Sequence, residues 1–307
     1  MCLVRTGLGA YCAILFRKGI IVSDDDVAKG WCEGSEEATL DLADVVERRM
    51  SELDGKVCLV SGGAGHIGRA ICEALLSEGA HVIAVGRREP AHAIESDGNR
   101  AAFYAADLRD AVASQGLIDH ISERFGRLDI LVNNAGGGPP VAAANASPEL
   151  TQKIISLNLL APLVLSQQAH SLLTKANDIA SIVNIASVSG ARPSPGTAAY
   201  GAAKAGLLNV TKSLAMEWGP RIRVNALIVG LVHNDAGIEH YGGDEGFRRV
   251  ADMLPLKRMA SPEDVANAVM MMCSDRAAYI SGANLEVDGG GEVPVFLHLA
   301  NESSTAK

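Results

Sequence analysis

The stretch that decides the fold is residues 56–68, which read KVCLVSGGAGHIG. An apolar run at 56–61 is typical of a buried strand, and it passes directly into a glycine-rich loop that opens a helical pattern. Glycines in such a loop let the backbone turn sharply and approach a diphosphate, whose charge is favoured at the helix N-terminus. The placement of the loop therefore predicts a dinucleotide site, whereas the loop alone is also compatible with a tight turn that binds nothing.

Short apolar runs and helix-length segments alternate through the rest of the chain. Strands are predicted at 56–61, 81–86, 101–106, 129–133, 180–186, 222–228 and 284–287. Helices are predicted at 67–77, 115–125, 148–175, 199–218 and 262–274. Most of the strand runs lack apolar/polar alternation, as expected of a parallel sheet that is covered on both faces. We expect an α/β fold with a doubly wound Rossmann-type parallel sheet, formed by a single domain over residues 50–307.

Residues 1–49 form an N-terminal extension that differs in pattern from the rest. Apolar residues between 38 and 53 recur at helical spacing, which predicts an amphipathic helix. Three interpretations stay open: an upstream start codon with Met50 as the working start, a flexible docking arm, or an organelle transit peptide.

Composition excludes several classes of protein. The 307 residues include 27 Lys+Arg and 36 Asp+Glu, for a net charge of −9, and no basic cluster that would bind nucleic acid. The apolar run at 10–16 is too short to span a membrane. The six cysteines include no C-x-x-C pair, which indicates reduced thiols and a cytoplasmic protein. No cluster has metal-ligand spacing, so we expect no metal.

Polar residues follow the predicted strands at the edge where such sheets bind ligands. Arg87 and Arg88 stand where Asp or Glu would bind the ribose hydroxyls of NAD(H), so we expect a preference for NADP(H), with NAD(H) as the alternative. Asp107 ends the third strand and is placed to accept a hydrogen bond from an adenine amino group. The pair Asn133 and Asn134 is interpreted as a structural clamp around the cofactor.

Tyr200 is the one tyrosine with a lysine four residues later, and this spacing stacks Tyr200 and Lys204 on one helix face. A nearby ammonium lowers a phenol pKa towards working pH, which suits general acid–base chemistry. Ser187 ends the fifth strand and is placed to hydrogen-bond a substrate oxygen. Asn158, in the preceding helix, is placed to position a water that leads to Lys204.

In order and spacing these residues resemble the short-chain dehydrogenase/reductase family, in the shorter single-domain branch that includes 3-oxoacyl-carrier-protein reductases. The resemblance covers about residues 50–291. It implies a homotetrameric NAD(P)-dependent oxidoreductase that interconverts a secondary alcohol and a ketone. Tyr200 would exchange the proton, Ser187 would steady the carbonyl or hydroxyl, Lys204 would also bind the nicotinamide ribose, and Asn158 would hold the relay water. The implied cofactor-binding residues are Gly62, Gly65, His66, Ile67, Gly68, Arg87, Arg88, Asp107, Leu108, Asn134, Ala135, Gly136, Tyr200, Lys204 and Val232.

Four positions depart from the family pattern. Ser61 replaces a usual Thr, His66 the usual middle glycine, Val229 a usual Pro, and Asn234 a Thr that commonly touches the cofactor. The glycine spacing resembles the extended branch of the family, so epimerase-like chemistry is an alternative, as is a catalytically silent NAD(P)-binding sensor or scaffold. Residues 233–254 fall where the family places its substrate lid. The substrate is left open between a 3-oxoacyl thioester, a polyol and an alicyclic or steroid-derived ketone.

Overall fold

The computed structural model describes residues 2–6, 9–16, 19–23, 53–233 and 242–294. The chain divides into two compact units, Met1–Ser51 and Glu52–Lys307. The first contains an antiparallel sheet in the order β1 (Cys2–Thr6), β2 (Gly9–Phe16) and β3 (Gly19–Ser23). The amphipathic helix expected at 38–53 lies, except for Leu53, outside the described residues.

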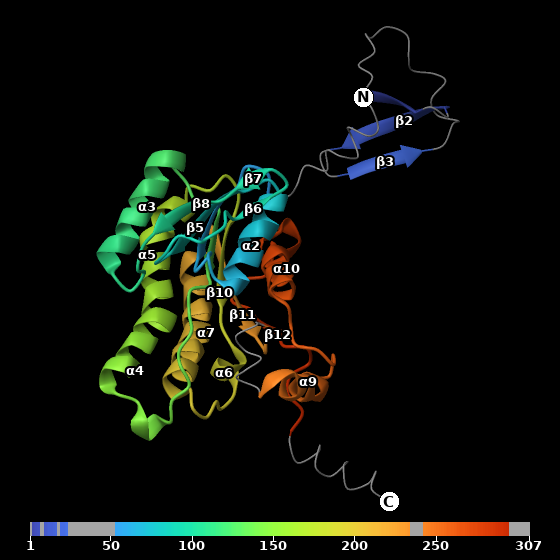
Figure 1. The fold of residues 1–307 in the computed structure, drawn as a ribbon. Helices are drawn as coiled ribbons and strands as arrows, with labels where there is room; N and C mark the ends of the chain where they lie inside the picture. Colours follow the sequence, from blue (N-terminus) through green and yellow to red (C-terminus); the bar gives the residue numbers. More distant parts are fainter. Residues whose placement is uncertain (1, 7–8, 17–18, 24–52, 234–241, 295–307) are drawn as a thin grey trace, which may run out of the picture. The chain divides into compact units, whose positions relative to one another are not determined.

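The second unit is built on a seven-stranded parallel sheet (Figure 1). Its order is β12 (Asn284–Val287), β11 (Ile222–Val229), β10 (Ala180–Ile185), β9 (Ile130–Asn133), β4 (Val57–Ser61), β5 (His81–Gly86) and β8 (Ala102–Ala105). The chain starts at the central β4, runs outward to β8 and then crosses to β9 and outward to β12, so the sheet is doubly wound. The predicted fold class is confirmed, and each predicted strand is present within one residue of its expected bounds.

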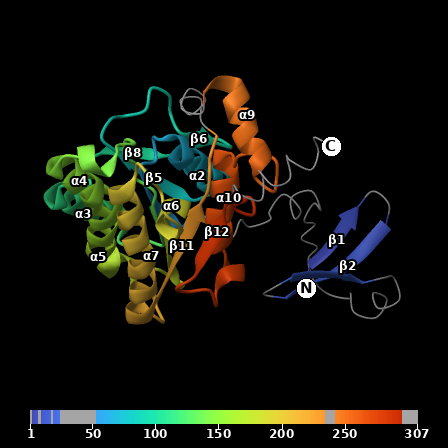
Figure 2. The same cartoon turned by 90° about the horizontal axis from the view of Figure 1, so that it is seen from below.

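Helices cover both faces of this sheet (Figures 1 and 2). On one face lie α2 (His66–Ser77) and α10 (Pro262–Cys273); on the other lie α3 (Ala111–Phe125), α5 (Ala161–Leu173) and α7 (Ala198–Trp218). The central strand shows why its sequence does not alternate. Cys58 and Val60 pack against α2 and α10, whereas Val57 and Leu59 pack into the opposite core.

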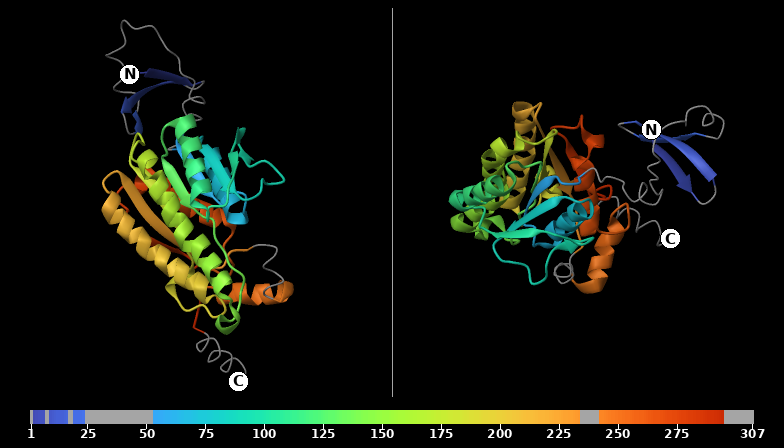
Figure 3. Two further views of the ribbon diagram at one scale, coloured as in Figure 1. Left: turned by 90° about the vertical axis from the view of Figure 1, so that its left-hand side faces the viewer. Right: turned by 90° about the horizontal axis from the view of Figure 1, so that it is seen from above.

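The helix predicted at 148–175 is interrupted. It forms α4 (Pro148–Ile155), a π-helical turn (Ser156–Leu160) and α5, which follow one another along one side of the sheet (Figure 3). Asn158 lies within the π-helical turn and is fully buried. Such turns widen a helix locally and are frequent at functional sites. The periodicity of apolar residues does not reveal where such a turn occurs.

Other differences from the prediction have local causes. Helix α3 begins at Ala111 rather than at 115 because the Asp110 side chain caps it, accepting from Val112 N at 2.9 Å. The remaining elements are β6 (Glu95–Ser96), β7 (Asn99–Arg100), α6 (Val188–Ala191), α9 (Gly243–Met253) and the 3-10 turns Ala143–Asn145 and Asp275–Ala277.

Candidate active site

The first turns of α7 hold the tyrosine and lysine that the sequence singles out. The Nζ atom of Lys204 lies 5.6 Å from the centroid of the Tyr200 ring, as the four-residue spacing predicts. The same Nζ donates a hydrogen bond of 2.7 Å to the Ile185 carbonyl at the end of β10. Ser187 lies two residues beyond that carbonyl, and its side chain hydrogen-bonds with Tyr200. The end of β10 and the start of α7 thus bring Ser187, Tyr200 and Lys204 together.

The pKa values in this group are set mainly by burial. Burial raises the pKa of the Tyr200 phenol, and the hydrogen bond with Ser187 opposes the rise with a smaller effect. Burial also lowers the pKa of Lys204 from 10.5 to about 8. The expected lowering of the Tyr200 pKa by Lys204 is therefore wrong for this geometry, because burial of both groups outweighs their attraction. Instead, burial brings the pKa of Lys204 itself close to neutral pH.

Asn158 joins this group to the loop after β9. Its Oδ1 accepts from Gly137 N at 2.8 Å, and its Nδ2 donates to the carbonyls of Gly137 and Ile154, at 2.9 Å each. A Cβ on Gly136 would lie 2.7 Å from Asn158 Oδ1 and 3.1 Å from Lys204 Nζ, so only glycine lets the loop pass between them. The side chain that we expected to hold a relay water thus holds the loop at Gly137. Its relay role stays a prediction.

The glycine loop is clamped to the same loop after β9. The hydroxyl that Ser61 retains in place of the usual Thr accepts from the backbone N–H groups of Asn134 and Ala135, at 2.9 Å each. The Asn134 side chain donates to the carbonyls of Ser61, at 3.0 Å, and Gly62, at 3.3 Å. The clamp interpretation is confirmed for Asn134. Asn133 is buried, and its amide donates to Ser166 and Asn184 within the core.

The loop also forms a cradle that fits a diphosphate. A Cβ on Gly68 would lie 2.1 Å from the Gly62 carbonyl oxygen, and Gly62 has a positive φ of 65°. Helix α2 begins at His66 behind Gly65, with no side-chain cap and no acidic residue in its first turn. Its first N–H groups and the positive end of its dipole are therefore available to an anion.

A cleft of about 610 Å³ runs from this cradle along the carboxyl edge of the sheet, a volume typical of small-molecule sites. Arg87 and Arg88 line it and are exposed. Neither guanidinium makes a hydrogen bond or ion pair with another residue that the structure describes. The cleft also contains Gly136, so its inner end lies against Lys204 and Asn158.

Asp107 lines the cleft beside Arg109, which sequence reasoning missed. The Arg109 guanidinium donates to both carboxylate oxygens, with Nε–Oδ1 at 2.9 Å and Nη2–Oδ2 at 2.5 Å. These hydrogen bonds, more than any other cause, lower the pKa of Asp107 to about 2. The carboxylate that we expected to meet an adenine amino group is thus already engaged by a cation.

Comparisons with known proteins match this architecture. A family model described as enoyl-(acyl carrier protein) reductase matches residues 62–292. D-threitol dehydrogenase from Mycolicibacterium smegmatis is 36% identical over 244 residues, which are 78% of this chain and 93% of the relative. The 3-oxoacyl-[acyl-carrier-protein] reductase of Rickettsia felis is 35% identical, over 78% of this chain and 98% of the relative. The ligand-free aldohexose dehydrogenase of Thermoplasma acidophilum has a TM-score of 0.73 at 29% identity, over 78% of this chain and 95% of that structure.

The chain belongs to the short-chain dehydrogenase/reductase family. As a short-chain dehydrogenase/reductase it is an oxidoreductase that acts on CH–OH groups and interconverts an alcohol and a ketone with a nicotinamide cofactor. This confirms the resemblance and the reaction class inferred from Ser187, Tyr200 and Lys204. Epimerase-like chemistry and a silent binding role are not needed to explain the site.

Most cofactor residues predicted for this short-chain dehydrogenase/reductase line the one cleft: Gly62, Gly65, His66, Ile67, Gly68, Arg87, Arg88, Asp107, Leu108, Asn134, Ala135, Gly136 and Val232. The predicted set lacks six further residues that line it: Ala64, Val85, Gly86, Ala106, Arg109 and Leu157. Arg109 was detectable in principle, because it follows Asp107 at the same strand end. Leu157 was not, since its place depends on the π-helical turn.

Of the departures at Val229 and Asn234, only Val229 has a setting that the structure describes. Gly230 is required after Val229, because a Cβ there would lie 2.8 Å from the Cα of Asp288. The Gly230 N–H donates to the Val287 carbonyl at 3.0 Å, which joins the ends of β11 and β12. Asn234 lies outside the described residues, as does the rest of the expected lid segment up to residue 241.

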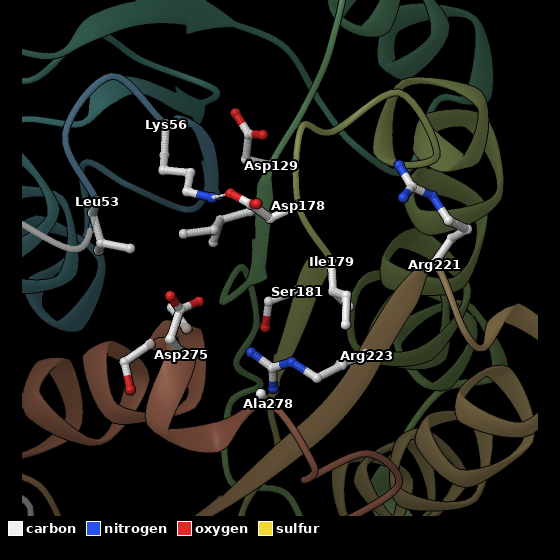
Figure 4. A pocket seen from close by; sticks show the side chains of 13 residues that line it. Leu53, Lys56, Asp129, Asp178, Ile179, Ser181, Arg221, Arg223, Asp275 and Ala278 are labelled. Atoms are coloured by element: carbon white, nitrogen blue, oxygen red, sulfur yellow. Dashed lines mark hydrogen bonds and ion pairs between the residues drawn. The ribbon is translucent and has the colours of Figure 1, made fainter. Parts of the chain in front are cut away.

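A second hollow, of about 290 Å³, lies at the opposite, amino-terminal edge of the sheet (Figure 4). Most of its charged groups are engaged within the fold. Lys56 pairs with Asp178 at 2.6 Å, and Arg223 donates to the Met272 carbonyl at 2.8 Å. These bonds join strand and helix ends, so the groups around the hollow stabilise this edge of the sheet.

Two findings bear on other classes of function. Within residues 53–233 and 242–294, no group of three His, Cys, Asp or Glu side chains is placed to hold a metal ion. In the part of the chain that the structure describes, no helix has both the length and the apolarity needed to cross a membrane.

Proposed function

We propose that this short-chain dehydrogenase/reductase prefers NADP(H) and uses Tyr200 as its general acid and base. The observation that carries this preference is which of the three arginines lining the cleft, Arg87, Arg88 and Arg109, are paired with an acidic side chain. Arg109 pairs with Asp107, whereas Arg87, which lies near enough to help lower the Asp107 pKa, and Arg88 make no ion pair or hydrogen bond among the described residues. Two free guanidinium groups suit a 2′-phosphate, and the one carboxylate beside them is compensated.

The nicotinamide cofactor, when bound, supplies or accepts the hydride. The N–H groups of residues 66–68 at the start of α2 would bind its diphosphate, and Arg87 and Arg88 would bind its 2′-phosphate. Lys204, held at the Ile185 carbonyl, would bind the nicotinamide ribose. Asn134, Ala135 and Gly136, which are clamped beside the glycine loop, line the same cleft.

Ser187 and Tyr200 act together on the substrate oxygen. In reduction the Tyr200 phenol donates a proton to the carbonyl oxygen, while the Ser187 hydroxyl donates a hydrogen bond to the same atom. In oxidation the Tyr200 oxygen takes the proton of the substrate hydroxyl. Lys204, with a pKa of about 8, is close enough to neutrality to hold or release a proton beside the phenol, and Asn158 would hold the relay water.

The substrate is a small molecule with a secondary alcohol or ketone. Relatives named as D-threitol dehydrogenase and 3β-hydroxysteroid dehydrogenase support a polyol or an alicyclic alcohol, and the Rickettsia reductase supports a 3-oxoacyl thioester. We also propose a cytoplasmic homotetramer. Exposed apolar side chains of Met271, Tyr279 and Ile280 support self-association.

A screen of the purified full-length protein tests the proposal. Threitol and glucose, a 3β-hydroxysteroid and a 3-oxoacyl thioester are each assayed with both cofactors by absorbance at the nicotinamide band. We expect one substrate class to dominate, with kcat/KM for the NADP(H) form at least about tenfold above that for NAD(H), the factor equivalent to 1.4 kcal/mol. An equal or reversed ratio would overturn the NADP(H) preference.

A further inference from the structure

His66 stands where the family usually has glycine, and its side chain makes a contact that glycine cannot make. The imidazole Nε2 donates a hydrogen bond of 2.8 Å to the backbone carbonyl of His233. The two residues are separated by 167 positions in the sequence. His66 is the first residue of α2, on the diphosphate cradle, whereas His233 follows the end of β11. The bond thus ties the cradle to a distant segment of the chain.

The segment around His233 is itself bound to the region before α10. Val232 pairs with Ala260 in an isolated parallel bridge, and the His233 N–H donates to the Ala260 carbonyl at 2.8 Å. Val232 also lines the cofactor cleft. A displacement of the His233 carbonyl therefore moves a residue of the cleft wall.

From His233 the contacts continue to α9. The His233 ring packs edge-on against Phe247 of α9, with centroids 5.1 Å apart and planes at 84°. Helix α9 lies beyond the carboxyl edge of the sheet, on the same side as α6 (Figure 1). Ala251 of α9 belongs to a small apolar cluster, separate from both main cores, that also contains Leu254 and Met259 from the segment after the helix. A helix with so small a core of its own depends on each further contact for its position.

We propose that His66 is a positioning residue that couples occupation of the diphosphate cradle to the position of α9. A diphosphate bound to the first N–H groups of α2 restrains the turn that carries His66, and His66 restrains the His233 carbonyl. The His233 ring transmits that restraint to Phe247. The proposal rests on the diphosphate occupying the α2 N-terminus, and it is independent of the choice between NADP(H) and NAD(H).

A second departure from the family pattern supports this role. Val229 occupies a position that is usually proline, so the chain lacks a fixed φ just before residues 231–233. The hydrogen bond from His66 restrains the same segment from outside. The two substitutions that looked unrelated in the sequence thus act on one stretch of backbone.

Amide hydrogen exchange of residues 242–254 in the full-length protein, with and without saturating NADPH, tests the coupling. In the wild type we expect NADPH to slow exchange in this segment by about three- to tenfold, the range that one net hydrogen bond supports. His66→Ala, which keeps the backbone N–H of residue 66, should remove most of this slowing when each protein is held at saturating NADPH, with the Kd from calorimetry fixing that concentration. His66→Gln, whose amide reaches the Nε2 position, should restore it.

His92→Ala serves as the matched control, because His92 is an exposed histidine of the same unit whose side chain has no part in the cleft. It should show the same slowing of exchange as the wild type.

The proposal would be overturned if NADPH slowed exchange in residues 242–254 equally in His66→Ala and in the wild type. It would also be overturned if NADPH did not change this exchange in the wild type. Loss of NADPH binding in His66→Ala would also overturn it, because the side chain of His66, and not only its backbone N–H, would then bind the cofactor. If the wild type binds NADH more tightly than NADPH, the exchange experiment is run with NADH. The test of His66 therefore does not depend on the proposed NADP(H) preference.

Discussion

Lys204 Nζ lies 5.6 Å from the centre of the Tyr200 ring and is anchored 2.7 Å from the Ile185 carbonyl oxygen. One turn of α7 therefore carries both groups, while the end of β10 fixes the lysine. This arrangement holds the ammonium beside the phenol without a direct bond between them, and it leaves the phenol oxygen to Ser187 and the substrate.

Replacing Tyr200 with Phe removes the proton donor and keeps the ring. We expect kcat to fall by about 10²- to 10⁴-fold, the usual contribution of general acid–base catalysis, while the Kd for NADPH changes by less than about twofold. Stopped-flow turnover and calorimetry measure the two quantities. Tyr104→Phe, in β8 and packed against His120, is the control and should keep wild-type turnover. Near-normal turnover of Tyr200→Phe would exclude the assigned role.

Lys204 makes stability depend on pH in the protein without cofactor. Its pKa is about 8 in the folded protein, below the ordinary lysine value of 10.5 that applies to the unfolded chain, so the unfolded chain binds more protons between these values. Below pH 8 the buried charge of Lys204 lowers the free energy of unfolding by roughly 3 kcal/mol, and this destabilisation is lost as the pH rises towards 10.5. We therefore expect Lys204→Met to gain free energy of unfolding relative to wild type at about pH 7, with the gain shrinking by about pH 9.5. A difference that is constant across this range contradicts the assigned pKa.

Arg87→Ala combined with Arg88→Ala removes both free guanidinium groups from the cleft. Two charge-assisted hydrogen bonds of about 1.5 kcal/mol or more each correspond to a rise of at least about a hundredfold in the Kd for NADPH. The Kd for NADH should change by about threefold or less. Arg100→Ala, at an exposed arginine in β7, is the control. An unchanged ratio of the two Kd values would leave the arginines without a role in selecting the cofactor.

Arg109 protects the 2′-phosphate site from the Asp107 carboxylate. In Arg109→Ala the Asp107 charge is uncompensated beside Arg87, so we expect NADPH binding to weaken by about three- to tenfold at low salt and less at about 0.5 M salt. The pKa of Asp107 should rise from about 2 towards its ordinary value. Adding Asp107→Asn to Arg109→Ala should restore NADPH binding. If the double variant binds as weakly as Arg109→Ala, Arg109 acts on the cofactor directly.

Deletion of residues 1–49 tests the division of the chain. Because Met1–Ser51 and Glu52–Lys307 are separate compact units, we expect a chain that starts at Met50 to keep the turnover and oligomer size of the full-length protein. Turnover and light scattering after size-exclusion chromatography measure both. A change in either would mean that the extension takes part in catalysis or assembly.

Local sequence signals determined the architecture of this protein. The apolar runs identified all seven parallel strands, because a strand buried on both faces needs apolar side chains at successive positions. The glycine loop between strand and helix located the diphosphate cradle, and the spacing of Tyr200 and Lys204 identified the reaction. Each of these signals lies within a few neighbouring residues, where backbone geometry alone relates sequence to position.

Tertiary structure alone decided the features that depend on distant residues. The π-helical turn at Asn158 accompanies hydrogen bonds to Gly137, 21 positions away, and the link from His66 to His233 spans 167 positions. The pKa values of Tyr200 and Lys204 follow from how deeply the folded chain buries them, which reversed the direction expected for the phenol. Burial and long-range hydrogen bonds arise only when the strands assemble, so neither apolar periodicity nor motif spacing predicts them.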